Sequence, residues 1–156
     1  MIIGGEHMQS IWYDVGTDQV HIVDQTRLPH EFQVLTLANM EAACHAIESM
    51  QVRGAPLIGV TAAYAVYLAL REDAQSLDHA CAALAATRPT AVNLQWALDR
   101  CRAALQSVAP ESRVLQALEL AQPMAKEDIA ICEAIGNHGA DRVESLWQEK
   151  RSSKER

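Results

Sequence analysis

The sequence contains few aromatic residues. Phe, Trp and Tyr together make up 4% of the 156 residues, and there is one Phe. Aromatic and β-branched side chains favour strands, whereas alanine, which is abundant here, is the strongest helix former. The composition therefore argues against a β-sandwich and favours packed helices. A hydrophobic share of 49% and a charged share of 21% exclude a chain that is disordered throughout.

An excess of basic residues is also missing. Lys and Arg number 13 against 20 Asp and Glu, which gives a net charge of −7. Proteins that bind nucleic acids neutralise phosphates with clustered Lys and Arg, so a broad nucleic-acid surface is excluded. One or two arginines can still hold a small phosphorylated ligand.

No segment is long enough to be a membrane span. The longest run without a charged residue, residues 54–70, has 17 residues and includes Pro56 and Gly59. A transmembrane helix needs about 20 mostly apolar residues. The run therefore predicts a buried helix. Residues 1–6 also lack the basic and apolar regions of a signal peptide, so we expect a soluble cytoplasmic chain without a membrane partner.

The cysteines form no closely spaced pair. They are Cys44, Cys81, Cys101 and Cys132. A structural zinc site needs tight ligand pairs, and disulfides form mainly in secreted proteins. Each cysteine falls on an apolar helical stripe, so we interpret all four as small buried hydrophobic residues and predict no metal site.

Short strands are predicted in the first part of the chain. Residues 11–13 and 20–23 are strand candidates, and the turn-forming residues 16–18 between them predict a hairpin. Residues 32–37 form a third candidate. Together they predict a small antiparallel sheet.

From Asn39 the apolar period becomes helical. Asn39 is the expected cap of a helix to about Met50, and Pro56 suits the first turn of a central, buried helix. Ser76 and Thr90 are the expected caps of the next two helices. A fifth helical region follows Pro110; we expect Pro123 to kink or split it, Gly136 and Gly139 to end it, and residues 141–150 to form a last helix.

These patterns predict an α+β fold that is mainly α, with a small antiparallel β element followed by a helical bundle. Residues 1–38 hold the strands, residues 39–150 form the helical domain, and residues 151–156, which contain no apolar residue, form a tail.

Two helix starts are candidate anion sites. In the first, Arg53, Gly54 and Ala55 precede Pro56. Free N–H groups and the helix dipole attract anions at such a place, glycine lets the backbone approach a ligand, and arginine can grip phosphate in a bidentate manner. An ordinary capped helix start with a solvent-facing arginine explains the same spacing.

The second candidate is Arg88 followed by Pro89 and Thr90, with Asn93 in the first turn. Two such starts in one acidic domain favour a shared phosphate site. The six histidines show no metal-ligand spacing, and no nucleophile-elbow, P-loop or dinucleotide motif is present. The residues contain no complete catalytic set.

At these segments the sequence resembles the methylthioribose-1-phosphate isomerase family, over about residues 10–150. The resemblance rests on four ordered motifs: residues 24–29 (Asp-Gln-Thr-Arg-Leu-Pro), 52–60 (Val-Arg-Gly-Ala-Pro-Leu-Ile-Gly-Val), 88–97 (Arg-Pro-Thr-Ala-Val-Asn-Leu-Gln-Trp-Ala) and 134–139 (Ala-Ile-Gly-Asn-His-Gly). Wider relatives include regulatory subunits of translation initiation factor two B and ribose-1,5-bisphosphate isomerase.

The resemblance implies an aldose–ketose isomerisation in methionine salvage, from 5-methylthioribose 1-phosphate to 5-methylthioribulose 1-phosphate, without a cofactor. It assigns substrate binding to Arg53, Gly54, Ala55 and Arg88, and it suggests a homodimer. The family's catalytic cysteine and aspartate belong to a further Rossmann-like domain, and no segment of this sequence matches them.

We therefore expect a truncated substrate-binding part that is inactive alone, with a frameshift or an early stop near Lys150. The alternatives are a non-catalytic sugar-phosphate-binding or regulatory module of the same family, a purely structural helical module, and an isomerase of another sugar phosphate.

Overall fold

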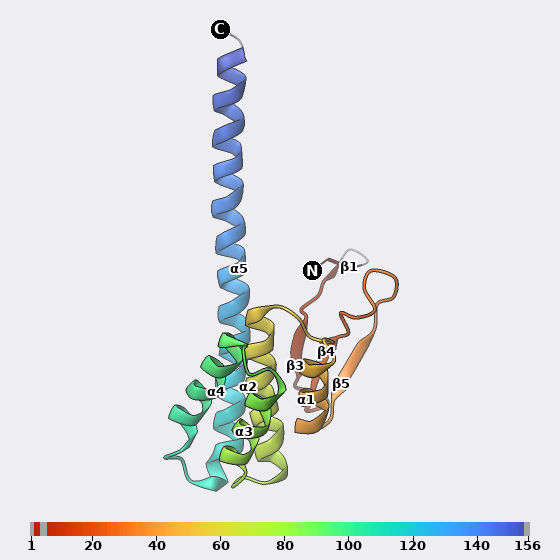
Figure 1. Cartoon of the computed structure of the whole chain (residues 1–156), viewed down its shortest axis with the longest axis vertical. Helices are drawn as coiled ribbons and strands as arrows, with labels where there is room; N and C mark the ends of the chain where they lie inside the picture. The colour runs from red at the N-terminus through yellow and green to blue at the C-terminus, as the bar shows by residue number, and fades with distance from the viewer. Residues whose placement is uncertain (1, 4–5, 155–156) are drawn as a thin grey trace. The chain divides into compact units, whose positions relative to one another are not determined.

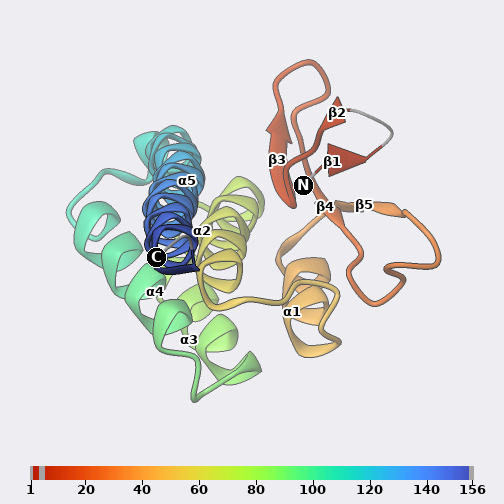
Figure 2. The same cartoon turned by 90° about the horizontal axis from the view of Figure 1, so that it is seen from above.

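The computed structural model describes residues 2–3 and 6–154, with side chains from residue 8 to residue 151. The chain divides into two compact units, residues 1–125 and 126–156, and each is considered by itself. Figure 1 labels most of the elements along the chain, and Figure 2 also labels β2.

The first unit begins with short antiparallel strands. β3 (Ile11–Asp14), β4 (Gln19–Val23) and β5 (Val34–Leu37) form a sheet in the order β3-β4-β5. The register pairs Ile11 with Ile22 and Val20 with Leu37, so these four apolar side chains enter the core. The predicted hairpin and third strand are confirmed. A further pair, β1 (Ile2–Ile3) and β2 (Glu6–His7), was not predicted.

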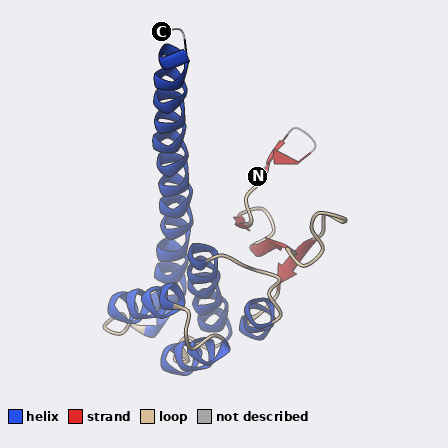
Figure 3. Cartoon of the chain, turned by 45° about the horizontal axis from the view of Figure 1, so that its top comes forward, coloured by secondary structure: helices blue, strands red, loops and turns tan. Residues whose placement is uncertain are grey.

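Five helices follow the sheet, which confirms the mainly α fold (Figure 3). They are α1 (Met40–Glu48), α2 (Ala55–Glu72), α3 (Leu77–Thr87), α4 (Val92–Leu105) and α5 (Pro110–Lys154). Asn39 caps α1 as predicted, because its side-chain oxygen accepts a 2.8 Å hydrogen bond from the Ala42 N–H. Among the described residues, no helix is both long and apolar enough to cross a bilayer.

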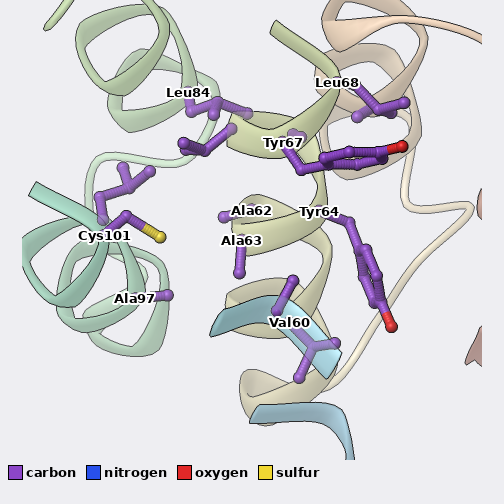
Figure 4. Packing of buried hydrophobic residues seen from close by; sticks show 14 of the residues in the cluster. Val60, Ala62, Ala63, Tyr64, Tyr67, Leu68, Leu84, Ala97 and Cys101 are labelled. Carbon is purple, nitrogen blue, oxygen red and sulfur yellow. The ribbon is translucent and has the colours of Figure 1, made fainter. Parts of the chain in front are cut away.

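α2 is the centre of the first unit. Every residue from 57 to 70 is buried, as its apolar sequence predicted. It contacts α1, α3 and α4, and Figure 2 shows it between α1 and α4. Figure 4 shows its side chains meeting Leu84 from α3 and Cys101 from α4. Three residues of the α5 segment within this unit complete the core: Ala117, Ala121 and Met124.

Asp18 ties the β3–β4 turn to α2. Its Oδ1 accepts 2.7 Å hydrogen bonds from the hydroxyls of Tyr13 and Tyr67. Arg71 donates to the Asp18 backbone carbonyl at 2.9 Å and lies 3.5 Å from its Oδ2. These donors favour the carboxylate and hold the pKa of Asp18 below its usual value, with the hydrogen bond from Tyr13 as the largest cause. The bonds from Tyr67 and Arg71 to Asp18 therefore fix the β3–β4 turn to the end of the central helix.

Of two further predicted caps, Thr90 is wrong and Ser76 is correct in position only. α4 begins after Ala91, which has no side-chain cap, and Thr90 lies one residue too early to serve as one. Ser76 does precede α3, but its hydroxyl donates to the carbonyls of Asp73 and Ala69 instead of capping the helix. A hydroxyl that finds carbonyl acceptors in the preceding turn is not available to the N–H groups of the next helix.

The predicted breaks in α5 are wrong as well. The helix stays continuous through Pro123, Gly136 and Gly139, and residues 141–150 belong to it. Pro123 removes one N–H from the ladder, but it is exposed, as is Glu119 four residues earlier, so water can satisfy the freed carbonyl. Glycine in a helix costs only about 1 kcal/mol and does not by itself end one.

The burial predicted for the cysteines holds for two of them. Cys81 and Cys101 are buried, Cys44 is partly buried, and Cys132 is exposed. Burial raises the pKa of Cys101 to about 12 and also raises that of Cys81, so both thiols stay protonated near neutral pH. The reading of Cys132 was wrong because residues 130–151 of α5 are all exposed, although the apolar stripe continues.

Candidate phosphate site at two helix starts

The loop that carries Arg53 is anchored at both sides of the residue. Val52 is fully buried, and its N–H donates to the Ala46 carbonyl at 3.1 Å. Before it, the Gln51 carbonyl accepts a 2.9 Å hydrogen bond from the Gln25 N–H. After it, Gly54 is the N-cap of α2. The backbone around the exposed Arg53 is therefore held in one place, which lowers the entropy lost when a ligand binds.

The start of α2 is open to a ligand. Gly54 has φ +98°, a region that favours glycine, and a Cβ built there meets nothing within 4 Å. The helix has no side-chain cap, and Pro56 in its first turn has no N–H of its own. The remaining first-turn N–H groups, including that of Ala55, are thus left to water or to an anion, which the helix dipole favours.

The start of α4 has the same character. Arg88 is the C-cap of α3, and its carbonyl accepts a 3.0 Å hydrogen bond from the Ala91 N–H in the turn that leads to α4. Ala91 cannot cap the helix with its side chain. Asn93 is partly buried in the first turn. Within the described part of the chain, neither Arg53 nor Arg88 has a side-chain hydrogen bond or an ion pair.

The structure brings the two helix starts to the same end of the bundle. Gly59, the fifth residue of α2, lies against Asn93, the second residue of α4: a Cβ at Gly59 would be 2.9 Å from the Asn93 carbonyl oxygen and 3.5 Å from the Ala97 Cβ. In Figure 4, α4 runs upward from Ala97 to Cys101, and α2 runs upward from Val60 to Leu68. The two helices are therefore parallel, and their dipoles point positive ends to the same side.

An apolar depression beside the α4 start was missed at the sequence level. It is an open hollow lined by Pro89, Thr90, Ala91, Val92, Gln95, Trp96 and Asp99. Val92 is 79% exposed and Trp96 50% exposed, with the Arg100 guanidinium 5.5 Å from the Trp96 ring centre. Val92 and Trp96 are four residues apart and lie outside the buried apolar stripe of α4, and this spacing could have predicted an exposed apolar surface here. Neither Arg53 nor Arg88 lines this hollow.

The residue 24–29 motif contacts the loop that leads into the residue 52–60 motif. Asp24 is buried, and its Oδ1 accepts hydrogen bonds from the Thr26 N–H at 2.9 Å and the Thr26 hydroxyl at 2.6 Å. This turn presents the Gln25 N–H to the Gln51 carbonyl. The residue 24–29 motif thus supports the loop of Arg53. The residue 134–139 motif lies in the second unit, in the exposed part of α5.

Comparison with known proteins gives consistent matches. Residues 51–149 match the initiation factor 2 subunit family. A methylthioribose-1-phosphate isomerase of Methylocella silvestris is 48% identical over 148 residues, which cover 94% of this chain and 40% of that protein. An uncharacterised protein encoded in the petC 3′ region of Rhodospirillum rubrum is 45% identical over 152 residues, 96% of this chain and 83% of that protein.

Two solved structures are also similar. The translation initiation factor eIF-2B subunit delta from A. fulgidus has a TM-score of 0.72 at 36% identity, over 79% of this chain and 38% of that one. The 5-methylthioribose 1-phosphate isomerase from Pyrococcus horikoshii OT3 has a TM-score of 0.67 at 30% identity, over 76% and 36%. The chain thus spans about 40% of the length of the isomerases that it matches.

Proposed function

Since this chain belongs to the initiation factor 2 subunit family, we propose that it is the sugar-phosphate-binding part of a methylthioribose-1-phosphate isomerase. Arg53, Gly54, Ala55 and Arg88 bind the phosphate of 5-methylthioribose 1-phosphate. The identity of 48% to an isomerase over 94% of the chain supports this choice of substrate.

One observation carries the proposal: two parallel helices present uncapped starts at one end of the bundle, each next to an arginine that has no hydrogen-bond or ion-pair partner among the described residues. N–H groups at a helix start donate to phosphate oxygens, and the aligned dipoles favour the negative charge. A guanidinium adds paired hydrogen bonds that a lysine cannot reproduce. The overall charge of −7 makes such a local positive site selective for a small anion over nucleic acid.

Binding alone does not produce turnover. The substrate carries its phosphate on the anomeric carbon, so its ring cannot open to a free aldehyde, and a proton or hydride must move between C2 and C1 under the control of positioned acid–base groups. By family resemblance those groups are a cysteine and an aspartate outside the matched region. Phosphate binding without them stabilises the ground state as much as the transition state, so the 156-residue chain binds substrate without isomerising it.

The test is calorimetric titration of 5-methylthioribose 1-phosphate into the wild type, R53A, R88A and the double variant. We expect each single change to weaken binding about tenfold or more, since a hydrogen bond to a charged group contributes about 1.5–3 kcal/mol. R142A, which removes an exposed arginine of the second unit, is the matched control and should bind normally. Equal affinities in all variants would refute the site. Ketose formation by the purified chain would refute its inactivity.

A second candidate is a non-catalytic sugar-phosphate-binding or regulatory module. It is favoured by the similarity to the eIF-2B delta subunit, whose TM-score of 0.72 exceeds the 0.67 of the isomerase structure. The two candidates differ in one mixing experiment. Isomerase activity on adding the remaining domain of a longer relative supports the isomerase part; saturable binding through Arg53 and Arg88 without any activity supports the module.

A further inference from the structure

Asn93 lies at the contact between the two helices that form the candidate phosphate site. It is the second residue of α4, and its backbone carbonyl oxygen lies 2.9 Å from the position that a Cβ on Gly59 of α2 would occupy. Because Gly59 has no side chain of its own, nothing separates the two helices at this level. The first turn of α4 is therefore packed directly against α2.

The side chain of Asn93 is on the α2 side of α4. Ala97, four residues later, is fully buried, and its Cβ lies 3.5 Å from the same Cβ position on Gly59. Residues four apart lie on one face of a helix, and side chains tilt toward the helix N-terminus. Since the two helices are parallel, the Asn93 side chain is directed past Gly59 toward the level of Ala55, where α2 begins.

The Asn93 amide is open to a ligand. The residue is partly buried, and its side chain has no hydrogen-bond partner among the described residues. The amide of Gln95, two residues later, differs in both respects, because it donates a 2.7 Å hydrogen bond to Asp99 and lines the hollow on another face of α4. In the first turn of α4, Asn93 thus supplies the polar side chain that faces α2.

We infer that Asn93 binds a hydroxyl of the sugar, on the carbon next to the one that carries the phosphate. This inference rests on the proposed function, because the phosphate bound by Arg53, Arg88 and the two helix starts is what places the sugar beside Asn93. The contact adds recognition of the sugar to a group of residues that otherwise recognises phosphate.

An amide at this position suits a hydroxyl better than a phosphate. The phosphate already has the N–H groups of two helix starts and two guanidinium groups as donors, and the carbonyl end of an amide repels phosphate oxygens. A hydroxyl is both a donor and an acceptor, so it can pair with either end of the amide. In a sugar 1-phosphate the C2 hydroxyl is the one nearest the phosphate, so an amide beside the phosphate reaches that hydroxyl first.

This contact makes Asn93 a residue that determines specificity. A site that hydrogen-bonds a hydroxyl of its ligand rejects an analogue that lacks this hydroxyl. One neutral hydrogen bond sets the size of the effect, which is a preference of about three- to tenfold for the hydroxylated sugar. Inorganic phosphate has no such hydroxyl, so its binding does not depend on Asn93.

Titrations with three probes, each followed by amide chemical shifts, test the inference: inorganic phosphate, ribose 1-phosphate and 2-deoxyribose 1-phosphate. The wild type should bind ribose 1-phosphate about three- to tenfold more tightly than the 2-deoxy sugar. N93A should bind the two sugars about equally and should keep the wild-type affinity for inorganic phosphate. Q95A removes an amide that faces the hollow, so it is the matched control and should keep the wild-type preference.

Alanine is a stronger helix former than asparagine, so N93A is expected to fold, and circular dichroism checks this. Three results would overturn the inference: a wild type that binds both sugars equally, an N93A variant that keeps the preference, or an N93A variant that binds all three probes more weakly by one common factor.

R53A separates this inference from the proposed function. It should weaken the binding of all three probes, because they share the phosphate. If R53A does so while the wild type shows no preference between the sugars, the phosphate site stands and only the role of Asn93 is refuted. If the wild type binds none of the probes, or R53A changes no affinity, the phosphate site itself is refuted, and the role of Asn93 with it.

Discussion

Replacing Gly59 with alanine tests whether close contact between α2 and α4 holds the two helix starts together. Alanine favours a helix over glycine by about 1 kcal/mol, so propensity alone predicts a more stable protein. The new Cβ, however, would lie 2.9 Å from the Asn93 carbonyl oxygen, against 3.4 Å for ordinary contact. The clash is with backbone, which cannot rotate away, so the helices must separate by about 0.5 Å and lose part of their packing along the contact.

Overpacking a core costs about 1–3 kcal/mol, and a backbone clash belongs near the upper end. After the gain in propensity, G59A should lower the free energy of unfolding by about 2 kcal/mol. Urea denaturation followed by circular dichroism measures it. G136A is the control, because a Cβ at Gly136 meets nothing within 4 Å, and it should increase helix stability. A G59A variant as stable as the wild type would refute the contact.

Three further changes test other parts of the fold. The lowered pKa of Asp18 means that its carboxylate stabilises the fold above its unfolded pKa near 3.8 and loses this effect as the pH falls through the lower folded value. D18N should therefore be less stable than the wild type at neutral pH, and its free energy of unfolding from urea denaturation should fall less steeply as the pH is lowered. An equally steep fall in D18N would contradict this. N39A removes the bond to the Ala42 N–H and should cost about 1 kcal/mol by the same assay; a neutral result would count against the cap. Under native conditions a thiol reagent should modify Cys132 rapidly and Cys101 only after unfolding; fast modification of Cys101 would show that it is not buried.

Local chemistry predicted the elements whose determinants are adjacent in sequence. Asn39 caps α1 because its side chain reaches an N–H three residues later, and Pro56 enters the first turn of α2 because its missing N–H costs nothing there. The alternation of apolar and polar residues in segments 11–13 and 20–23 predicted paired strands, because only a register that buries the apolar face of both strands is favourable.

Interactions between distant segments could not be predicted from the sequence. The hydrogen bond from the Gln25 N–H to the Gln51 carbonyl joins two backbone groups, so no side-chain pattern in the sequence predicts it, yet it supports the loop of Arg53. The packing of Gly59 against Asn93, which brings the helix starts together, likewise cannot be predicted before the fold is known. Cys132 has the spacing of a core residue, and only the structure shows that it is exposed.

For the candidate site, the sequence indicated the residue types and the structure adds their environment. Gly54 was expected to allow close approach of a ligand, and its φ of +98° and open side are consistent with that role. The expected cap Thr90 is displaced by Ala91, which leaves the start of α4 without a side-chain acceptor. This error strengthens the anion-site interpretation, because an uncapped start has more N–H groups to offer.

Mapping of amide chemical shifts during a titration with 5-methylthioribose 1-phosphate tests the central claim most directly. The account predicts saturable changes concentrated at the backbone amides of Gly54, Ala55 and Leu57 in the start of α2 and at Val92 and Asn93 in the start of α4, with both sets following one binding curve. Absence of any change, or changes confined to other parts of the chain such as the exposed half of α5, would contradict it.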